Sequence, residues 1–158
     1  MPKKNPKLYI ATSSQLIHWV ELIQVQFKHI DIDVISSWHN DKFKCTKISA
    51  FEIDKSQIEE CDILLAIHPI SIGSASEATY AMSLNKYVVY HCPIDISKYR
   101  ASLQPEKAEQ FPLWFAHFPS ISELSFKQKQ ENKRFMTHHR EELIYCLNHI
   151  RDRILNDV

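Results

Sequence analysis

Glycine is almost absent from this chain: its 158 residues contain a single one, Gly73. An average globular protein has about 7% glycine, so this sequence does without it nearly everywhere. We predict that Gly73 lies in the turn between a buried strand and a helix. At such a turn, glycine either adopts unusual backbone angles or lets a ligand approach the main chain closely. Glu77 follows four residues later, and we expect it in the first turn of that helix.

An excess of charge is also missing, because 19 lysines and arginines balance 19 aspartates and glutamates. This balance gives no electrostatic reason to expect a nucleic-acid polymer or an anionic membrane as a partner. No apolar run approaches the roughly 20 residues that span a bilayer. The polar N-terminus also lacks the apolar segment of a signal peptide. The four cysteines form neither a Cys-x-x-Cys pair nor a zinc-binding spacing. We therefore expect a cytoplasmic protein with free thiols and without a metal or other cofactor.

The apolar pattern predicts one α/β domain. Short apolar runs predict five strands, at residues 7–12, 32–38, 61–67, 86–92 and 114–118. Helical spacing predicts a helix after the first strand, helices over 48–60 and 74–84, and a helical region over about 120–157 that is broken near 127–132. The alternation of strand and helix favours a flavodoxin/Rossmann-like three-layer sandwich of about five parallel strands with helices on both faces. The domain is expected to span residues 1–158, with a core over about 7–125 and a C-terminal helical extension.

In such a sheet, ligands bind at the carboxyl ends of the strands, where the strand order reverses. Trp38 at one of these ends offers a flat face on which a base could stack. Hydroxyl groups and helix amides at the other ends could hold sugar or phosphate oxygens. We interpret His68 and His91 as ordinary polar residues. We interpret Asp54 as a surface residue whose side chain is within reach of a sugar.

Several segments occur in an informative order and spacing. They are Leu8-Tyr9-Ile10-Ala11, Ser36-Ser37-Trp38, Ile58-Glu59-Glu60-Cys61-Asp62-Ile63-Leu64-Leu65 and Gly73-x-x-x-Glu77-x-x-Tyr80-Ala81-x-x-x-Asn85-Lys86-Tyr87-Val88-Val89. In this order they resemble the nucleoside 2-deoxyribosyltransferase-like superfamily, which includes deoxynucleoside 5′-monophosphate N-glycosidases. The resemblance covers roughly residues 7–125.

The resemblance implies a site for glycosyl transfer. The glutamate that matches Glu77 attacks the anomeric carbon of the sugar as the base leaves. The aspartate that matches Asp62 is a second candidate catalytic residue, although it can equally be a strand-start residue that bonds a neighbouring segment. The implied substrate-binding positions are Tyr9, Ala11, Thr12, Ser13, Trp38, Ser71, Gly73 and Ser74. The implied partners are a small nucleoside or nucleotide and further copies of the chain, in a homodimer or larger homo-oligomer.

The sequence also departs from the family pattern. Ser71 replaces an acid that the transferases carry, as in the branch that hydrolyses nucleoside monophosphates. The glycine-rich phosphate loop of that branch is not reproduced at residues 11–14. Asn85 replaces a glycine, which a left-handed helix cap would accommodate. Three functions therefore stay open: cleavage or transfer of an N-glycosidic bond, a Toll/interleukin-receptor-type NAD glycohydrolase, and a catalytically silent nucleotide-binding module.

Overall fold

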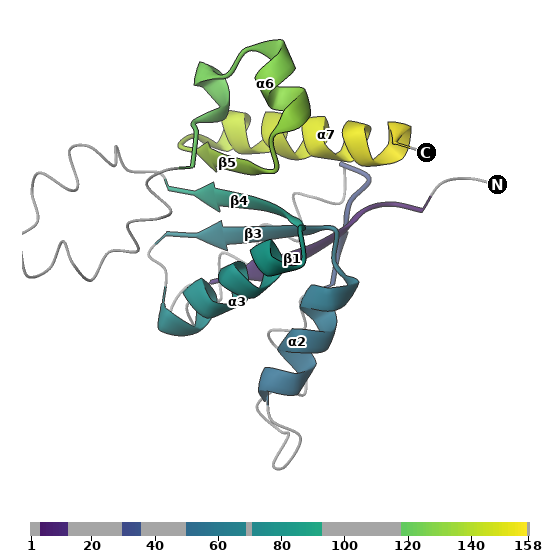
Figure 1. The fold of residues 1–158 in the computed structure, drawn as a ribbon, viewed down its shortest axis with the longest axis vertical. Coiled ribbons are helices and arrows are strands. Elements are labelled where there is room, and N and C mark those ends of the chain that lie inside the picture. Colours follow the sequence, from purple (N-terminus) through teal and green to yellow (C-terminus); the bar gives the residue numbers. More distant parts are fainter. Residues whose placement is uncertain (1–3, 13–29, 36–49, 69–70, 93–117, 158) are drawn as a thin grey trace, which may run out of the picture.

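The computed structural model describes residues 4–12, 30–35, 50–68, 71–92 and 118–157 (Figure 1). Within these ranges, five parallel strands form one sheet in the order β2-β1-β3-β4-β5. The strands are β1 (Lys7–Ala11), β2 (Asp33–Val34), β3 (Ile63–Ile67), β4 (Tyr87–His91) and β5 (Arg134–Thr137). The helices are α2 (Ala50–Glu60), α3 (Ile72–Ser83), the short 3₁₀ helix η4 (Ile121–Glu123), α6 (Phe126–Glu131) and α7 (Arg140–Asn156). This strand order is flavodoxin-like, and it confirms the predicted fold class.

The core has two layers because side chains alternate across the sheet. Leu8 and Ile10 of β1 pack in a cluster with residues of α7, whereas Tyr9 and Ala11 pack with residues of α2 and α3. Figure 1 shows α7 and the α2–α3 pair on opposite sides of the strands. Strands that are covered on both faces are apolar at nearly every position. This is why the run over β3 predicted a central strand so clearly.

The C-terminal third corrects one prediction. Residues 120–157 do not form a helix interrupted only once, because β5 lies between α6 and α7 and pairs with β4 from Val88↔Arg134 to His91↔Thr137. The strand predicted at 114–118 lies outside the described residues, except for Phe118 at its end. In β5, Phe135 packs into one core layer and Met136 into the other. Two adjacent apolar residues in a four-residue strand show no clear period. The helical spacing of the residues around them therefore predicted a helix here.

The described residues also allow the predictions about thiols, membrane spans and metal sites to be compared with the structure. Cys61, Cys92 and Cys146 are buried free thiols. Among the helices that the structure describes, none is both long and apolar enough to cross a bilayer. The same ranges contain no group of three or more His, Cys, Asp or Glu side chains placed to hold a metal ion.

Asn85 follows the C-terminal end of α3 in the left-handed conformation, with φ of 60°. Asparagine tolerates this conformation better than other residues that carry a side chain. We expect Asn85→Ala to lower the free energy of unfolding by about 1 kcal/mol, while Asn85→Gly preserves it. Urea denaturation of the three proteins measures both values. An alanine variant as stable as the wild type would contradict the argument.

Candidate functional site

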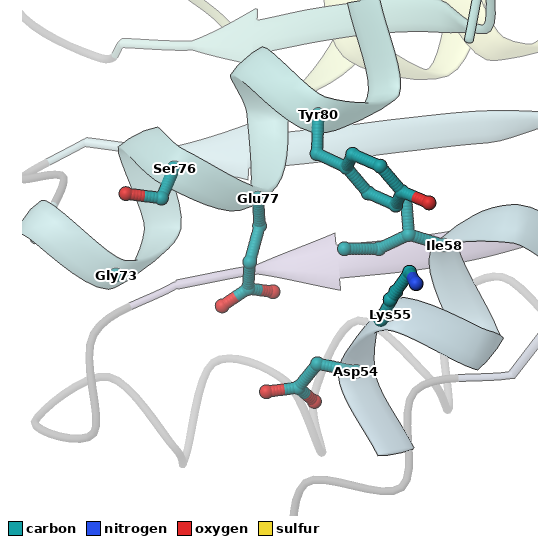
Figure 2. A pocket seen from close by; sticks show the side chains of 7 residues that line it. All are labelled: Asp54, Lys55, Ile58, Gly73, Ser76, Glu77 and Tyr80. Atoms are coloured by element: carbon teal, nitrogen blue, oxygen red, sulfur yellow. The ribbon is translucent and has the colours of Figure 1, made fainter. Parts of the chain in front are cut away.

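A cavity of about 500 Å³ lies between α2 and α3 (Figure 2). Asp54, Lys55 and Ile58 line it from α2, and Gly73, Ser76, Glu77 and Tyr80 line it from α3. The volume falls within the range of about 300–1,000 Å³ that is usual for sites of small ligands. Because α3 begins just after β3, the N-terminal end of the cavity wall lies at the carboxyl end of the sheet, where the sequence predicted a ligand site.

The face that α3 turns toward the cavity follows from its sequence. Residues three, four and seven positions after Gly73 are Ser76, Glu77 and Tyr80, a spacing that places them on one side of a helix. The adjacent side carries Ser74, Ala78 and Ala81, which are buried. These small residues let α3 pack closely on the sheet, and its longer polar side chains project into the cavity.

Ser71 determines where α3 begins. Its Oγ accepts a hydrogen bond from the Ser74 backbone N–H at 3.1 Å and donates one to Ser74 Oγ at 3.0 Å, which makes Ser71 the N-cap. The helix therefore begins at Ile72, earlier than predicted, and Glu77 is its sixth residue rather than a first-turn residue. Gly73 lies within the helix, and its φ is not positive. The prediction that Gly73 lies in the turn before the helix was therefore wrong, and of its two alternatives the one of unusual backbone angles is excluded.

Tyr9 connects the sheet to the cavity. Its side chain is fully buried, and the carboxylates of Glu77 and Asp54 share its single hydroxyl proton as hydrogen-bond acceptors. Burial, together with the charges of Glu77 and Asp54, raises the pKa of Tyr9 far above its ordinary value of 10. The phenol therefore stays protonated at neutral pH and supplies a hydrogen-bond donor behind two carboxylates. Figure 2 shows Glu77 and Asp54 extending into the same space from the two helices.

The other end of the cavity is held by Glu59. The Tyr80 hydroxyl group donates a hydrogen bond to Glu59 Oε1 at 2.5 Å, and Lys86 Nζ donates one to the Glu59 carbonyl oxygen at 2.9 Å. Lys55 lies 3.9 Å from the same carboxylate. The Tyr80–Glu59 hydrogen bond joins α3 to α2 and keeps the Tyr80 ring at the wall. Lys55 is the cation among the lining residues that the structure describes.

Asp62 lies away from the cavity. It precedes β3, and its Oδ2 accepts a hydrogen bond from the Lys7 backbone N–H at 2.8 Å. The Asp62 backbone N–H in turn donates to the Lys7 carbonyl oxygen at 2.8 Å. The side chain thus joins the beginnings of β1 and β3 at the amino end of the sheet, whereas Glu77 serves the opposite end. The contacts are those of the strand-start alternative.

The remaining predicted site residues have different locations. Gly73 and Glu77 line the cavity, and Tyr9 lies directly behind it. Ala11, Thr12 and Ser74 are buried, and Ser71 is exposed at the cap of α3. Ser13 and Trp38 lie outside the described residues.

Four lining residues were not predicted to belong to the site: Lys55, Ile58, Ser76 and Tyr80. Asp54 was expected on the surface, within reach of a sugar. Helical spacing would have indicated Ser76 and Tyr80, which share a face with Glu77. Nothing in the sequence distinguishes Asp54 from the other acidic residues of α2, because its role depends on how closely α2 approaches Tyr9.

The two histidines at the strand ends are paired within the protein. His68 Nδ1 lies 2.6 Å from the Tyr90 hydroxyl oxygen, and His91 Nδ1 lies 2.8 Å from Thr137 Oγ1. Burial lowers the pKa of His68, and burial together with nearby His138 lowers the pKa of His91 to about 4. Both imidazoles are therefore neutral near pH 7, and neither lines the cavity.

Comparison with known proteins gives similarity at the level of the fold. No family model matches the sequence, and no curated protein matches it. The solution structure of BlsM is similar with a TM-score of 0.57 at 14% identity, over 98% of this chain and 97% of that chain. The CMP N-glycosidase BcmB from Clostridium botulinum gives a TM-score of 0.41 at 16% identity, over 54% of this chain and 71% of that chain. The similarity to BlsM is one of fold and supports the α/β architecture of the described residues.

The raised pKa of the buried Tyr9 phenol makes the stability of the fold depend on pH in the alkaline range. Because folding raises the pKa of Tyr9, the unfolded chain releases this proton first, near its ordinary value of 10. The contribution of the protonated Tyr9 phenol to the free energy of unfolding is therefore fully present below about pH 10 and is lost as the pH rises above it. We expect the free energy of unfolding to fall less between about pH 8 and 11 in Tyr9→Phe than in the wild type.

Urea denaturation at both pH values measures this difference. Tyr145→Phe is the matched control, because Tyr145 is half-exposed on α7 and should leave the pH dependence unchanged. Equal losses of stability in the wild type and Tyr9→Phe would contradict the argument.

Proposed function

We propose that the protein cleaves or transfers the N-glycosidic bond of a nucleoside or nucleoside 5′-monophosphate, with Glu77 as the nucleophile. The observation that carries this proposal is the Glu77 carboxylate, which lines a ligand-sized cavity with the buried Tyr9 hydroxyl group and Asp54 beside it. The arrangement agrees with the resemblance of the Gly73–Glu77 segment to nucleoside 2-deoxyribosyltransferases. It also lies at the end of the sheet where α/β proteins bind their ligands.

The chemistry requires a carboxylate placed against an oxocarbenium-like carbon. A Glu77 oxygen attacks C1′ of the sugar and forms a glycosyl ester, while the C1′–N bond breaks and its electron pair leaves with the base. The departing nitrogen takes up a proton from solvent. Water or a second base then attacks C1′, gives one proton back to solvent and releases the Glu77 carboxylate. Hydrolysis and transfer therefore differ only in the acceptor.

Tyr9 is the positioning residue in this scheme. A half-buried carboxylate such as that of Glu77 is costly without a hydrogen-bond donor, and its orientation is then poorly defined. The Tyr9 phenol hydrogen-bonds with Glu77, and its raised pKa keeps it a donor at working pH. Tyr9 thereby holds the attacking oxygen in place without transferring a proton itself.

Asp54 faces the same space from α2 and gives the cavity a second carboxylate. We assign it to the sugar, whose hydroxyl groups donate hydrogen bonds that an aspartate accepts. Ile58 and the Tyr80 ring supply the apolar wall, since the Tyr80 hydroxyl group is already bonded to Glu59. This combination of an apolar wall and a few placed polar groups is usual for small-ligand sites.

The test is release of free base from nucleosides, deoxynucleosides, their 5′-monophosphates and NAD, followed by chromatography. We expect Glu77→Gln to lower the rate by at least about 10³-fold, because the amide is a poor nucleophile of the same shape. Glu52→Gln is the matched control, since Glu52 is an exposed acid of α2 that does not line the cavity. Thermal unfolding verifies that both variants are folded.

Unchanged release by Glu77→Gln would overturn the assignment of the nucleophile. Release of nicotinamide from NAD alone would favour the NAD glycohydrolase alternative. Binding of a nucleotide without release of any base would favour a silent binding module.

A further inference from the structure

The backbone conformation at position 73 does not require the single glycine of the chain. Gly73 is the second residue of α3, where glycine is a poorer helix former than alanine, and its φ is not positive. Among the described residues, two positions adopt positive φ, and they are occupied by Asp31 and Asn85. The described part of the chain therefore uses aspartate and asparagine where glycine is normally favoured, and it places glycine where the backbone does not require it.

Packing within the described protein does not require this glycine either. A Cβ atom at position 73 would lie 3.8 Å from Ser71 Oγ, the nearest atom among the described residues, which is an ordinary van der Waals contact. The space beside the Gly73 α-carbon belongs to the cavity instead. A side chain here would fit the protein and would occupy volume that is otherwise open to a ligand.

The two neighbours of Glu77 along the cavity wall differ greatly in size. Tyr80 lies three residues after Glu77 and Gly73 lies four residues before it, so each is one helical turn away. Tyr80 is bulky and is held by its hydrogen bond to Glu59. Figure 2 shows Glu77 between the two, with Gly73 at the bare end of the wall. A ligand whose reacting carbon meets the Glu77 carboxylate therefore finds room on the Gly73 side.

We propose that Gly73 is a specificity-determining residue: a nucleoside held against Glu77 extends along α3 over Gly73, and the missing side chain admits it. The proposal rests on the proposed function, because it names a nucleoside or its 5′-monophosphate as the occupant. It adds that position 73 sets an upper limit on ligand size without contributing to the chemical step.

A size series at this position tests the proposal. We expect Gly73→Ala to weaken binding of the best-bound ligand about 10-fold and Gly73→Val to weaken it about 100-fold, because each added carbon removes cavity volume. Calorimetry against the common deoxynucleosides and their 5′-monophosphates gives the dissociation constants. If the wild type releases base, binding is measured in a Glu77→Gln background so that the ligand is not consumed.

Thermal unfolding without ligand separates this role from a structural one. Gly73→Ala should raise the unfolding temperature by about 2–4 °C, since alanine is the better helix former. Thr79→Ala is the matched control: Thr79 is exposed on α3 outside the cavity, so the substitution improves helix propensity while leaving binding unchanged. A gain in stability combined with a loss of binding at position 73 alone supports the proposal.

The proposal and the proposed function fail in different ways. Gly73 variants that bind as tightly as the wild type overturn the steric role, even if base release depends on Glu77. Graded loss of binding without any base release in the wild type overturns the proposed function and supports the steric role. A wild-type protein that binds no member of the panel overturns the steric role as stated, because it names a nucleoside as the occupant.

Discussion

The hydrogen bonding of the buried Tyr9 hydroxyl group is the interaction on which the cavity depends. A phenol with no exposed surface must find an acceptor, because an unpaired hydroxyl group in the core costs about 1–3 kcal/mol. Its partners here are Glu77 from α3 and Asp54 from α2, so one group on β1 engages both helices. The same contact places two carboxylates at a partly enclosed surface and provides them with a donor that does not ionise at neutral pH. Burial of the phenol and the placement of both carboxylates therefore depend on one contact.

The two ends of the sheet carry different contacts: those at the amino end join strands, and those at the carboxyl end form the cavity wall. At the amino end, Asp62 and the Lys7 main chain exchange hydrogen bonds that join β1 to β3. At the carboxyl end, Ser71 caps α3, and the residues of α3 line the cavity. A carboxylate at the amino end can stabilise strand pairing without contacting the cavity. Asp62 and Glu77 therefore lie in different environments, although β3 alone is the strand between them in the sequence. The Tyr80–Glu59 contact then limits how far α2 and α3 can separate.

Much of this arrangement could be predicted from the sequence, because buried parallel strands are continuous apolar runs. The runs over β1, β3 and β4 predicted the centre of the sheet and brought Gly73 and Glu77 to its edge. The strand β5 was missed, since its two core residues, Phe135 and Met136, are adjacent and belong to opposite layers. The sequence predicts Asp54 as a surface residue within reach of a sugar, because its contact with Tyr9 depends on how closely α2 approaches β1. Such a contact between distant segments leaves no mark in local periodicity.

The distribution of glycine links the backbone to the cavity. Glycine is normally concentrated where φ must be positive, yet the described positions of that kind carry Asp31 and Asn85. Both residues tolerate the left-handed conformation through their short polar side chains, so the backbone is served without glycine. At position 73 no side chain, however small, leaves the cavity wall as open as glycine does, and the poorer helix propensity is the cost of that opening. The position of the one glycine in the chain therefore matches the opening of the cavity wall better than it matches any need of the described backbone.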